Sequence, residues 1–280
     1  MSIKTITVFV DGGAASDARL AAACEMALKH DAHVVAVAFA RQFDMGVYAM
    51  PGAEMAMDLS AIDTARGEAK ELAKRAEAKM QAAGVSADAR WASSIAAGLE
   101  ETAARAARHS DIAIVGPAGG EGPAGEAAEA AFEGALFGSG RPVLMLPEGW
   151  SKPVGTKVML CWDGSHVAAR ALQDAMPFIK AAGAVTVALV DPEPGVDGTG
   201  EEPGADIATV IARHGVAVEV KTIARAGASV AERLLSTAQE MGADLMVMGG
   251  YGHSRLREAI FSGVSRSVLE APGVPVLVSH

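Results

Sequence analysis

The sequence predicts an α/β protein with two tandem domains, each a doubly wound, five-stranded parallel sheet with helices on both faces. Three observations lead to this prediction. Short apolar runs alternate with helical patterns, the same signals occur twice in the same order, and the core-forming residues are small. Half of the 280 residues are hydrophobic, but only 4% are aromatic. Small aliphatic side chains suit helices that pack closely on a parallel sheet buried on both faces.

The two halves of the chain carry the same three signals. These are an apolar run that ends in Asp-Gly, a run that opens with Asp and ends in Gly-x2-Gly, and a Pro before a short apolar run. They occupy residues 8–12 and 160–164, 111–119 and 244–252, and 142–144 and 275–277. Such a repeat in fixed order indicates a duplication. We predict domains at residues 1–147 and 154–280, joined by a Pro- and Gly-containing linker.

The second half shows the expected alternation of strands and helices. Ser165 is expected to cap its first helix, whose apolar residues recur at helical spacing. Those residues are Ala168, Ala171, Leu172, Ala175, Met176 and Ile179. A later helix carries Val230, Leu234, Leu235 and Ala238, and the last helix spans about 258–270. Strands are expected at 157–162, 185–190, 216–223, 245–248 and 276–278, with a loop at 192–206.

The first half repeats this plan with one insertion. Its first helix is expected to bury Leu20, Ala23, Cys24, Ala27 and Leu28. The insertion covers about residues 41–60 and contains four methionines, which are adaptable packing residues. We expect it to form a flap over the sheet or an interface. The methionines are Met45, Met50, Met55 and Met57.

Composition excludes several classes of function. The formal net charge of −10 argues against binding to nucleic acid. There is no 18-residue apolar span, and the first residues lack a signal-peptide layout, so we expect no membrane association. Cys24 and Cys161 are expected to be buried thiols in a reducing compartment. These features together favour a cytoplasmic protein.

A glycine-rich segment after the strand at 245–248 suggests an anion site. Gly249, Gly250 and Gly252 would let backbone N–H groups approach a ligand, and a helix start would follow. Arg255 and Arg257 add positive charge, so phosphate is the best-suited ligand. An ordinary strand-to-helix turn with solvated arginines is the alternative. Asp163 also follows a strand, so it is expected to line the same crevice, or else to cap the next helix.

These residues resemble the universal stress protein family, and the whole chain looks like a tandem member of it. The resemblance implies a Rossmann-like fold of the adenine nucleotide alpha hydrolase-like type. Nucleotide-binding members share an Asp after the first strand and the motif Gly-x2-Gly-x9-Gly-Ser/Thr. Asp163, Gly249 and Gly252 match these elements, whereas the last pair is inverted here as Ser262-Gly263.

The resemblance implies a site in the second half for ATP or a related adenine nucleotide, with the need for Mg²⁺ undecided. Asp163 would lie by the ribose or base, and the glycine loop by the phosphates. Ser265 is close enough in sequence to supply a hydroxyl. The implied binding residues are Asp163, Val190, Met248, Gly249, Tyr251, Gly252, Arg255, Ser262, Gly263, Val264 and Ser265.

The first half departs further from the family pattern. Asp11, Gly116 and Gly119 keep the early elements, but Glu129 and Ala130 stand where the second half has Ser262 and Gly263. The segment carries Glu121, Glu126, Glu129 and Glu133 and no base, whereas its counterpart carries three arginines. Near-contact charges interact with about 4 kcal/mol at an effective dielectric constant of about 20. We therefore predict that the first half does not bind nucleotide.

The resemblance also implies partners. The two halves would pair through their last strands as a pseudo-dimer, and two chains would be able to form a homodimer. The output would be regulation through conformation or protein partners. Two alternatives stay open: a nucleotide-free interaction module, and a slow nucleotide hydrolase. We expect no catalytic residue and no metal site, because zinc spacing, a nucleophile–base pair and a P-loop are all missing from the sequence.

Overall fold

The computed structural model describes residues 2–39, 59–92, 96–117, 122–195, 201–250 and 263–280. The first half contains, in order, β1 (Thr5–Val10), α1 (Ala14–His30), β2 (His33–Phe39), α2 (Leu59–Ala82), β3 (Ser86–Ala92), α3 (Ala96–Ala107), β4 (Ile112–Val115), α4 (Gly122–Ser139) and β5 (Val143–Met145). The second half contains β6 (Lys157–Cys161), α5 (His166–Ala181), β7 (Ala184–Val190), α6 (Ala205–Ala212), β8 (Glu219–Ile223), α7 (Val230–Met241), β9 (Leu245–Gly249), α8 (Val264–Glu270) and β10 (Val276–Ser279).

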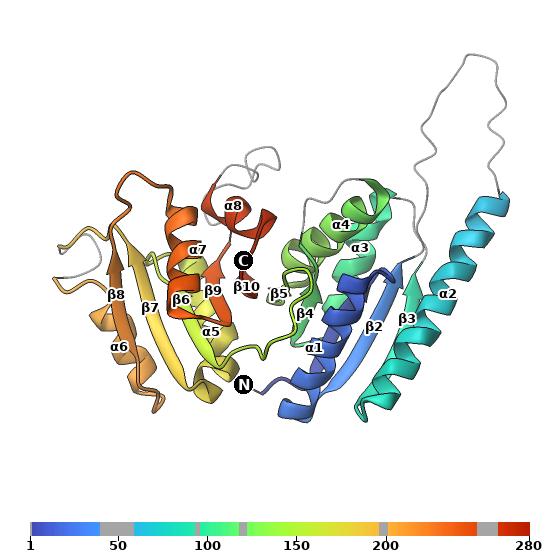
Figure 1. The fold of residues 1–280 in the computed structure, drawn as a ribbon, viewed down its shortest axis with the longest axis horizontal. Coiled ribbons are helices and arrows are strands. Elements are labelled where there is room, and N and C mark those ends of the chain that lie inside the picture. The colour runs from blue at the N-terminus through green and yellow to red at the C-terminus, as the bar shows by residue number, and fades with distance from the viewer. Residues whose placement is uncertain (1, 40–58, 93–95, 118–121, 196–200, 251–262) are drawn as a thin grey trace, which may run out of the picture.

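The strands form one ten-stranded sheet in the order β3-β2-β1-β4-β5-β10-β9-β6-β7-β8. Within each half all neighbours are parallel, and β5 and β10 pair antiparallel at the centre. Figure 1 shows the two halves side by side, with α2 and β3 at one end and α6 and β8 at the other. The predicted fold class is confirmed: each half is a doubly wound, five-stranded parallel sheet.

The central strands meet with a two-fold pattern. Leu144 pairs with Leu277, which is its own counterpart in the repeat, and Val143 pairs with Val278. Contacts in which equivalent residues meet each other are typical of the symmetric interface of a dimer. All four of these side chains are fully buried. The junction between the halves is therefore part of the hydrophobic core.

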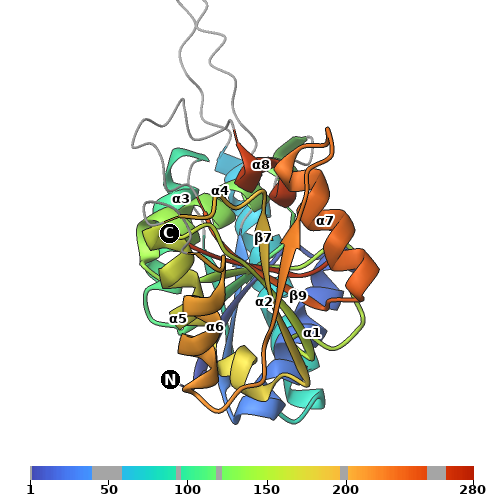
Figure 2. The same ribbon diagram turned by 90° about the vertical axis from the view of Figure 1, so that its left-hand side faces the viewer.

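Helices cover both faces of the sheet. One buried cluster holds residues of α1, α2, α5 and α6, and a second holds residues of α3, α4, α7 and α8. In Figure 2, α5 and α6 lie on one side of β7 and α7 lies on the other. Within the described residues, no helix is both long enough and apolar enough to cross a bilayer.

A repeated aspartate fastens the first strand of each half. The Asp111 carboxylate accepts hydrogen bonds from the backbone N–H groups of Lys4 and Thr5, at 2.7 and 3.0 Å. Asp244 does the same for Thr156 and Lys157, at 2.7 and 2.8 Å. Each aspartate thus joins the start of one strand to the residue just before another strand that is distant in sequence. The Asp that opens the second repeated signal therefore has a structural role, which sequence reasoning did not foresee.

The predicted helical faces are largely confirmed. Every apolar residue predicted for the face of α5 is buried. In α1 the prediction for Leu28 is wrong, because its side chain is 61% exposed. At about 100° per residue, Leu28 lies about 80° around the helix from Leu20, beyond the buried arc. Met26, on the other side of that arc, is buried in its place.

Three further predictions differ from the structure at their edges. The last helix begins at Val264, not at about residue 258, and Gly263 is its N-cap. The third strand of the second half begins at Glu219, not at residue 216, because its pairing with β7 starts at Thr186. Val216 and Val218 still pack against the core, which explains their apolar pattern. In the first half α2 begins at Leu59, within the predicted insertion. The methionines at positions 45, 50, 55 and 57 lie outside the described residues.

Candidate functional site

The candidate crevice lies where the strand order of the second half reverses. β6 and β9 are neighbours, although β7 and β8 lie on one side of the pair and β10 on the other. Asp163 follows the carboxyl end of β6, and Gly249 ends β9. In open α/β sheets, ligands bind outside the carboxyl ends of the strands at such a reversal. The structure thus brings Asp163 and Gly249 to neighbouring strand ends.

Asp163 shapes the turn into α5. Its Oδ1 accepts a hydrogen bond from the backbone N–H of Ser165 at 2.9 Å, and the side chain is exposed. The cap of α5 is Ser165, whose hydroxyl accepts from the N–H of Ala168 at 3.2 Å. The prediction of a Ser165 cap is confirmed, and the alternative reading of Asp163 as the cap is wrong. Asp163 therefore supports the helix start indirectly, and its exposed side chain follows the carboxyl end of β6.

Gly249 is required by packing. A Cβ atom at this position would lie 2.5 Å from both Ala168 N and Val167 C, so the first turn of α5 rests directly on the end of β9. At Gly250, a Cβ would lie 2.6 Å from Cγ2 of Val278. These two glycines let helix and strands approach closely whether or not a ligand is bound.

Glycine at position 263 is favoured for a different reason than at positions 249 and 250. It precedes α8 as the N-cap with φ 154° and ψ 178°, a backbone region that L side chains rarely adopt. A Cβ there would meet nothing within 4 Å, so the backbone conformation and not crowding favours glycine. This accounts physically for a glycine in the second place of the inverted pair. Val264 and Ser265 follow, half-buried, in the first turn of α8.

Part of the predicted site lies outside the described residues. This applies to Tyr251, Gly252, Arg255 and Ser262, and also to Arg257. Of the remaining predicted residues, Val190 is half-buried at the end of β7, and Met248 is buried near the end of β9. The described part of the site therefore consists of its strand ends and the start of α8.

Next to Val190, an ion pair that sequence reasoning missed frames one side of the crevice. Arg225 Nε donates to Asp191 Oδ2 at 2.8 Å, and the backbone N–H of Arg225 donates to Asp191 Oδ1 at 3.1 Å. The hydrogen bond from the Arg225 side chain, followed by the backbone bond, lowers the pKa of Asp191. The sequence did offer one sign of this pair, because Asp191 follows the end of a strand as Asp163 does. The pair ties the ends of β7 and β8 together.

The Cys161 thiol, close to Asp163 in the chain, has low nucleophilicity. Cys161 ends β6, two residues before Asp163, and its side chain is buried. Burial, followed by the charge of Asp163, raises the pKa of Cys161 to about 12. Since the thiolate is the nucleophilic form of cysteine, this residue does not offer a nucleophile near neutral pH. The expectation of a buried thiol at Cys161, and at Cys24, is confirmed.

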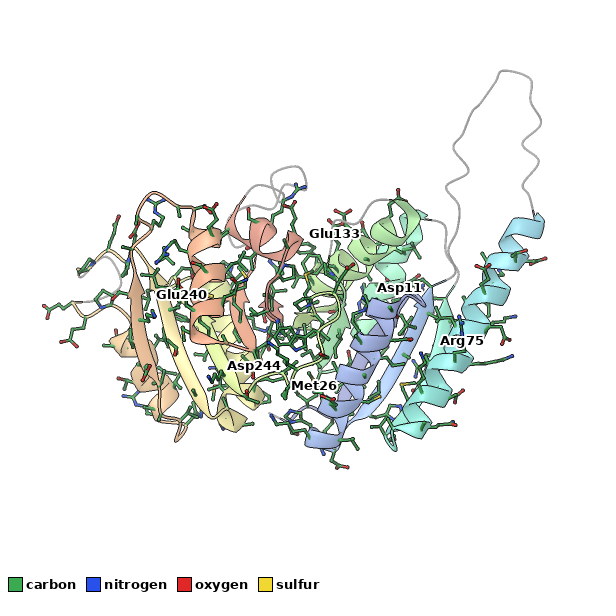
Figure 3. All side chains as sticks on the ribbon, in the orientation of Figure 1. Asp11, Met26, Arg75, Glu133, Glu240 and Asp244 are labelled. Carbon is green, nitrogen blue, oxygen red and sulfur yellow. The ribbon has the colours of Figure 1, made fainter. Side chains whose placement is uncertain are left out.

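In the first half, Asp11, the counterpart of Asp163, forms an ion pair with an arginine of α1. Arg19 Nη2 donates to Asp11 Oδ2 at 2.7 Å, and the Arg19 side chain is only 7% exposed. Its Nη1 lies so close to Gly116 that a Cβ on that glycine would be 2.5 Å away. Figure 3 shows Asp11 beside the start of α1. The glycine kept at position 116 thus accommodates a guanidinium.

The second half has no such arginine at the matching position. Counting from Asp11 and Asp163, Arg19 corresponds to Ala171, which is fully buried.

The second difference between the two halves is in the charge of the segment after the glycine. Glu126, Glu129 and Glu133 belong to α4, the helix that corresponds to α8. The only described arginine of the second-half segment, Arg266, is exposed and forms an ion pair with Glu270. The two halves therefore differ here in two ways: in the residue that stands at the position of Arg19, and in the charges carried by the segment after the glycine.

Comparison with known proteins gives a consistent result. The universal stress protein family model matches residues 156–280. A universal stress protein from Archaeoglobus fulgidus DSM 4304 superposes with a TM-score of 0.72 at 20% identity, covering 99% of this chain and 96% of that one. A protein from Pseudomonas aeruginosa UCBPP-PA14 assigned to the same family gives a TM-score of 0.55 at 19% identity, with 99% and 93% covered. Among curated proteins, none matches this chain in sequence.

At these identities the structural likeness shows a shared fold, which extends over both halves. The family match covers the second half, including Asp163, Gly249 and α8. Residues 156–280 match the universal stress protein family model, and over its whole length the chain shares its fold with the Archaeoglobus fulgidus universal stress protein.

Proposed function

We propose that this protein binds ATP or a related adenine nucleotide in its second half, at one site per chain, and acts in the stress response through conformation or partners. One observation carries the proposal: Asp163 and Gly249 end adjacent parallel strands at the reversal of strand order. That place in an α/β sheet favours a ligand with phosphates. The regulatory output is what the resemblance to the universal stress protein family implies.

In this proposal, each part of the nucleotide has its own residues. Asp163 accepts hydrogen bonds from the ribose or the base. Val190 and Met248 provide apolar surface near the strand ends, while Gly249 and Gly252 present backbone N–H groups to the phosphates. Arg255 and the hydroxyl groups of Ser262 and Ser265 assist at the phosphate end. Mg²⁺ would accompany ATP through the phosphates.

The proposal gives the first half a different role. Asp11 is already paired with Arg19, and the side chain of Arg19 fills the space beside Gly116. We therefore propose that this half binds no nucleotide and serves as the permanent partner of the second half in an intramolecular pseudo-dimer. The buried Leu144–Leu277 contact supports this arrangement. Association of two chains into a homodimer, in the cytoplasm, is part of the same proposal.

A nucleotide-free interaction module is the second candidate. It is favoured by the inverted Ser262-Gly263 pair and by the packing that already requires glycine at positions 249 and 250. Mass spectrometry of small molecules released from the purified, denatured protein separates the candidates. A copurified adenine nucleotide supports the first. An empty protein whose melting temperature does not change with ATP and Mg²⁺ supports the module and contradicts the nucleotide proposal.

Slow hydrolysis is tested in the same preparation. If the protein is a hydrolase, ADP accumulates with bound ATP, and an Asp163→Ala variant loses this activity. Our proposal predicts binding without turnover above the rate of the variant. Sustained ADP production by the wild type alone would replace the regulatory proposal with an enzymatic one.

A further inference from the structure

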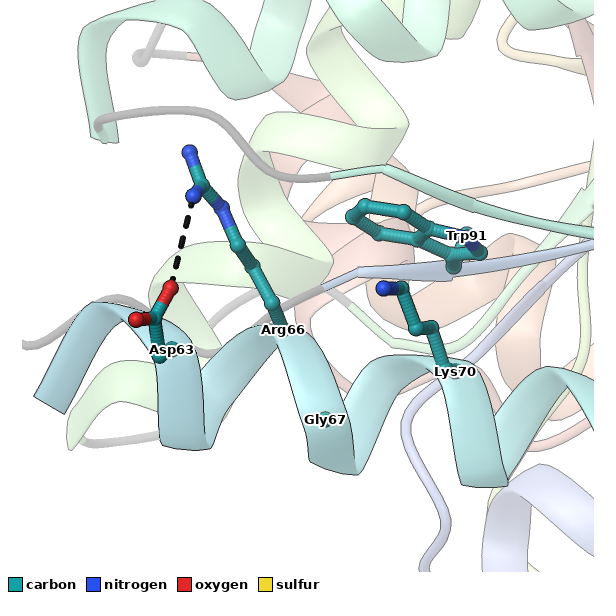
Figure 4. Close-up of a pocket in the computed structure, with 5 residues that line it drawn as sticks. All are labelled: Asp63, Arg66, Gly67, Lys70 and Trp91. Carbon is teal, nitrogen blue, oxygen red and sulfur yellow. Dashed lines mark ion pairs between the residues drawn. The ribbon is translucent and has the colours of Figure 1, made fainter. Parts of the chain in front are cut away.

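A second hollow lies in the first half, far along the sheet from the crevice described above. It has a volume of about 630 Å³ and is lined by Asp63, Arg66, Gly67 and Lys70 of α2 and by Trp91 of β3. Small-molecule sites in proteins have volumes of about 300–1,000 Å³. Figure 4 shows Arg66 and Lys70 rising from the same side of α2, with Lys70 directed at the indole of Trp91. The hollow therefore has the size and the polar lining of a ligand site.

Two cations line one wall of this hollow. Arg66 and Lys70 are four residues apart on α2, so they project one helical turn apart on one face. Arg66 Nη1 lies 3.6 Å from Asp63 Oδ1, in an ion pair whose two side chains are 49% and 78% exposed. Exposed pairs of this kind are weak, because water screens them. An incoming anion can therefore compete with Asp63 for the guanidinium.

Trp91 of β3 lies next to Lys70 in this hollow. Trp91 is 40% exposed, one of the few large apolar side chains among the described residues with such exposure. The Lys70 ammonium lies 4.8 Å from the centre of its ring, a cation–π contact that orients the indole. An indole in contact with Lys70 offers a stacking surface next to positive charge.

Gly67 lies between the two cations and has no packing reason to be glycine. It lies within the 24-residue helix α2, where glycine is unfavourable compared with alanine. A Cβ at this position would meet nothing within 4 Å, and no positive φ is recorded for it. Residues that break a local rule without a structural gain are often found at functional sites. Because glycine has no side chain, position 67 leaves the space of the hollow open.

We propose that this hollow binds a phosphate ester of a planar ring compound. Arg66 and Lys70 would bind the phosphate, since a guanidinium matches phosphate geometry with two parallel hydrogen bonds. As Lys70 turns from the indole to the phosphate, Trp91 would stack on the ring. The volume exceeds what inorganic phosphate alone requires, which favours a ligand with both parts. This inference is independent of the nucleotide site in the second half, because it uses different residues in the other domain.

The test uses riboflavin 5′-phosphate as the probe, with riboflavin and inorganic phosphate as its two parts. We expect saturable quenching of flavin fluorescence by the full chain, as the ring stacks on Trp91. Riboflavin should bind about tenfold or more weakly, because it lacks the charge-assisted contacts. The variant Arg66→Ala/Lys70→Ala should show the same loss. Lys74→Ala is the matched control, because this exposed lysine is on the same helix and pairs with Glu71.

A second variant keeps every charge and blocks the space. Gly67→Leu places a good helix former over the floor of the hollow, so we expect loss of probe binding with an unchanged or higher melting temperature. Equal binding by wild type, Arg66→Ala/Lys70→Ala and Gly67→Leu would overturn the proposal, as would no binding by the wild type. Loss of probe binding in Asp163→Ala would also overturn it, by locating the flavin in the second half. That result would leave the nucleotide proposal intact.

Discussion

Arg19 Nη2 lies 2.7 Å from Asp11 Oδ2, and this ion pair occupies the place in the first half that corresponds to the candidate crevice of the second. Asp11 also accepts a hydrogen bond from the backbone N–H of Gly13 at 2.9 Å, so both of its oxygens have partners within the domain. In the second half, Ala171 stands at the position of Arg19. The aspartate of the first half is thus engaged by Arg19, whereas the second half has no arginine at the matching position.

Replacing Arg19 by alanine should destabilise the protein strongly. The guanidinium is buried and the Asp11 carboxylate is one-third exposed, so removal of one partner leaves a poorly solvated charge. We expect the free energy of unfolding to fall by about 2–3 kcal/mol. Urea unfolding followed by circular dichroism measures this. Arg225→Ala removes an exposed ion pair and should cost less than about 1 kcal/mol. Equal effects of the two variants would contradict a structural role for Arg19.

Gly249→Ala should lower stability in the absence of any nucleotide. The new Cβ would lie 2.5 Å from backbone atoms of Val167 and Ala168, which cannot shift independently of α5. We expect a loss of about 2–3 kcal/mol in the free energy of unfolding. Gly183→Ala is the control, because its Cβ would meet Thr156 O at an ordinary 3.6 Å. A stable Gly249→Ala protein would show that packing does not require glycine at this position.

The Asp191 carboxyl should titrate at unusually low pH. Its hydrogen bonds from Arg225 lower its pKa in the folded protein. The stability contributed by this pair is thus present above the usual aspartate pKa and is lost as the pH falls below about 4. Carbon-detected NMR titration of the side chain measures the pKa directly. In Arg225→Ala the value should return toward its ordinary range, and an unchanged value would exclude Arg225 as the cause.

Cys161 should resist alkylation in the folded protein. With its pKa raised to about 12 by burial, roughly one thiol in ten thousand is ionised at pH 8. We expect iodoacetamide to modify it slowly at pH 8 and rapidly after unfolding in guanidinium chloride, as quantified by mass spectrometry of the peptides. Rapid labelling in the native state would show that the thiol is accessible and ionised.

The sequence predicted the repeat, the fold class and most strands, because these depend on local apolar patterns. The faces of α1 and α5 followed from helical spacing, and only Leu28, at the edge of the α1 stripe, was misplaced. Contacts between distant segments were out of reach. Arg19 approaches Gly116, and Asp244 accepts hydrogen bonds from Thr156, across separations of roughly 90 to 100 positions in the chain. The spacing of apolar residues along the sequence carries no information about such contacts.

The candidate site shows the same division. Asp163 and Gly249 were placed correctly at neighbouring strand ends, since parallel strands have their carboxyl ends at the same edge of the sheet. From the sequence, Gly249 was interpreted as giving a phosphate access to the backbone N–H groups. The structure shows the first turn of α5 against it. Only the packing of a helix on a strand end, a tertiary contact, distinguishes these two reasons for a glycine.

The central claim is one nucleotide site per chain, in the second half. Isothermal titration with ATP and Mg²⁺ tests it most directly, with the wild type compared with Asp163→Asn and Asp11→Asn, each first checked for a folded melting profile. We predict one site per chain in the wild type, loss of binding in Asp163→Asn, and one retained site in Asp11→Asn. Loss of binding in Asp11→Asn with full binding in Asp163→Asn would contradict the account, as would two sites per chain.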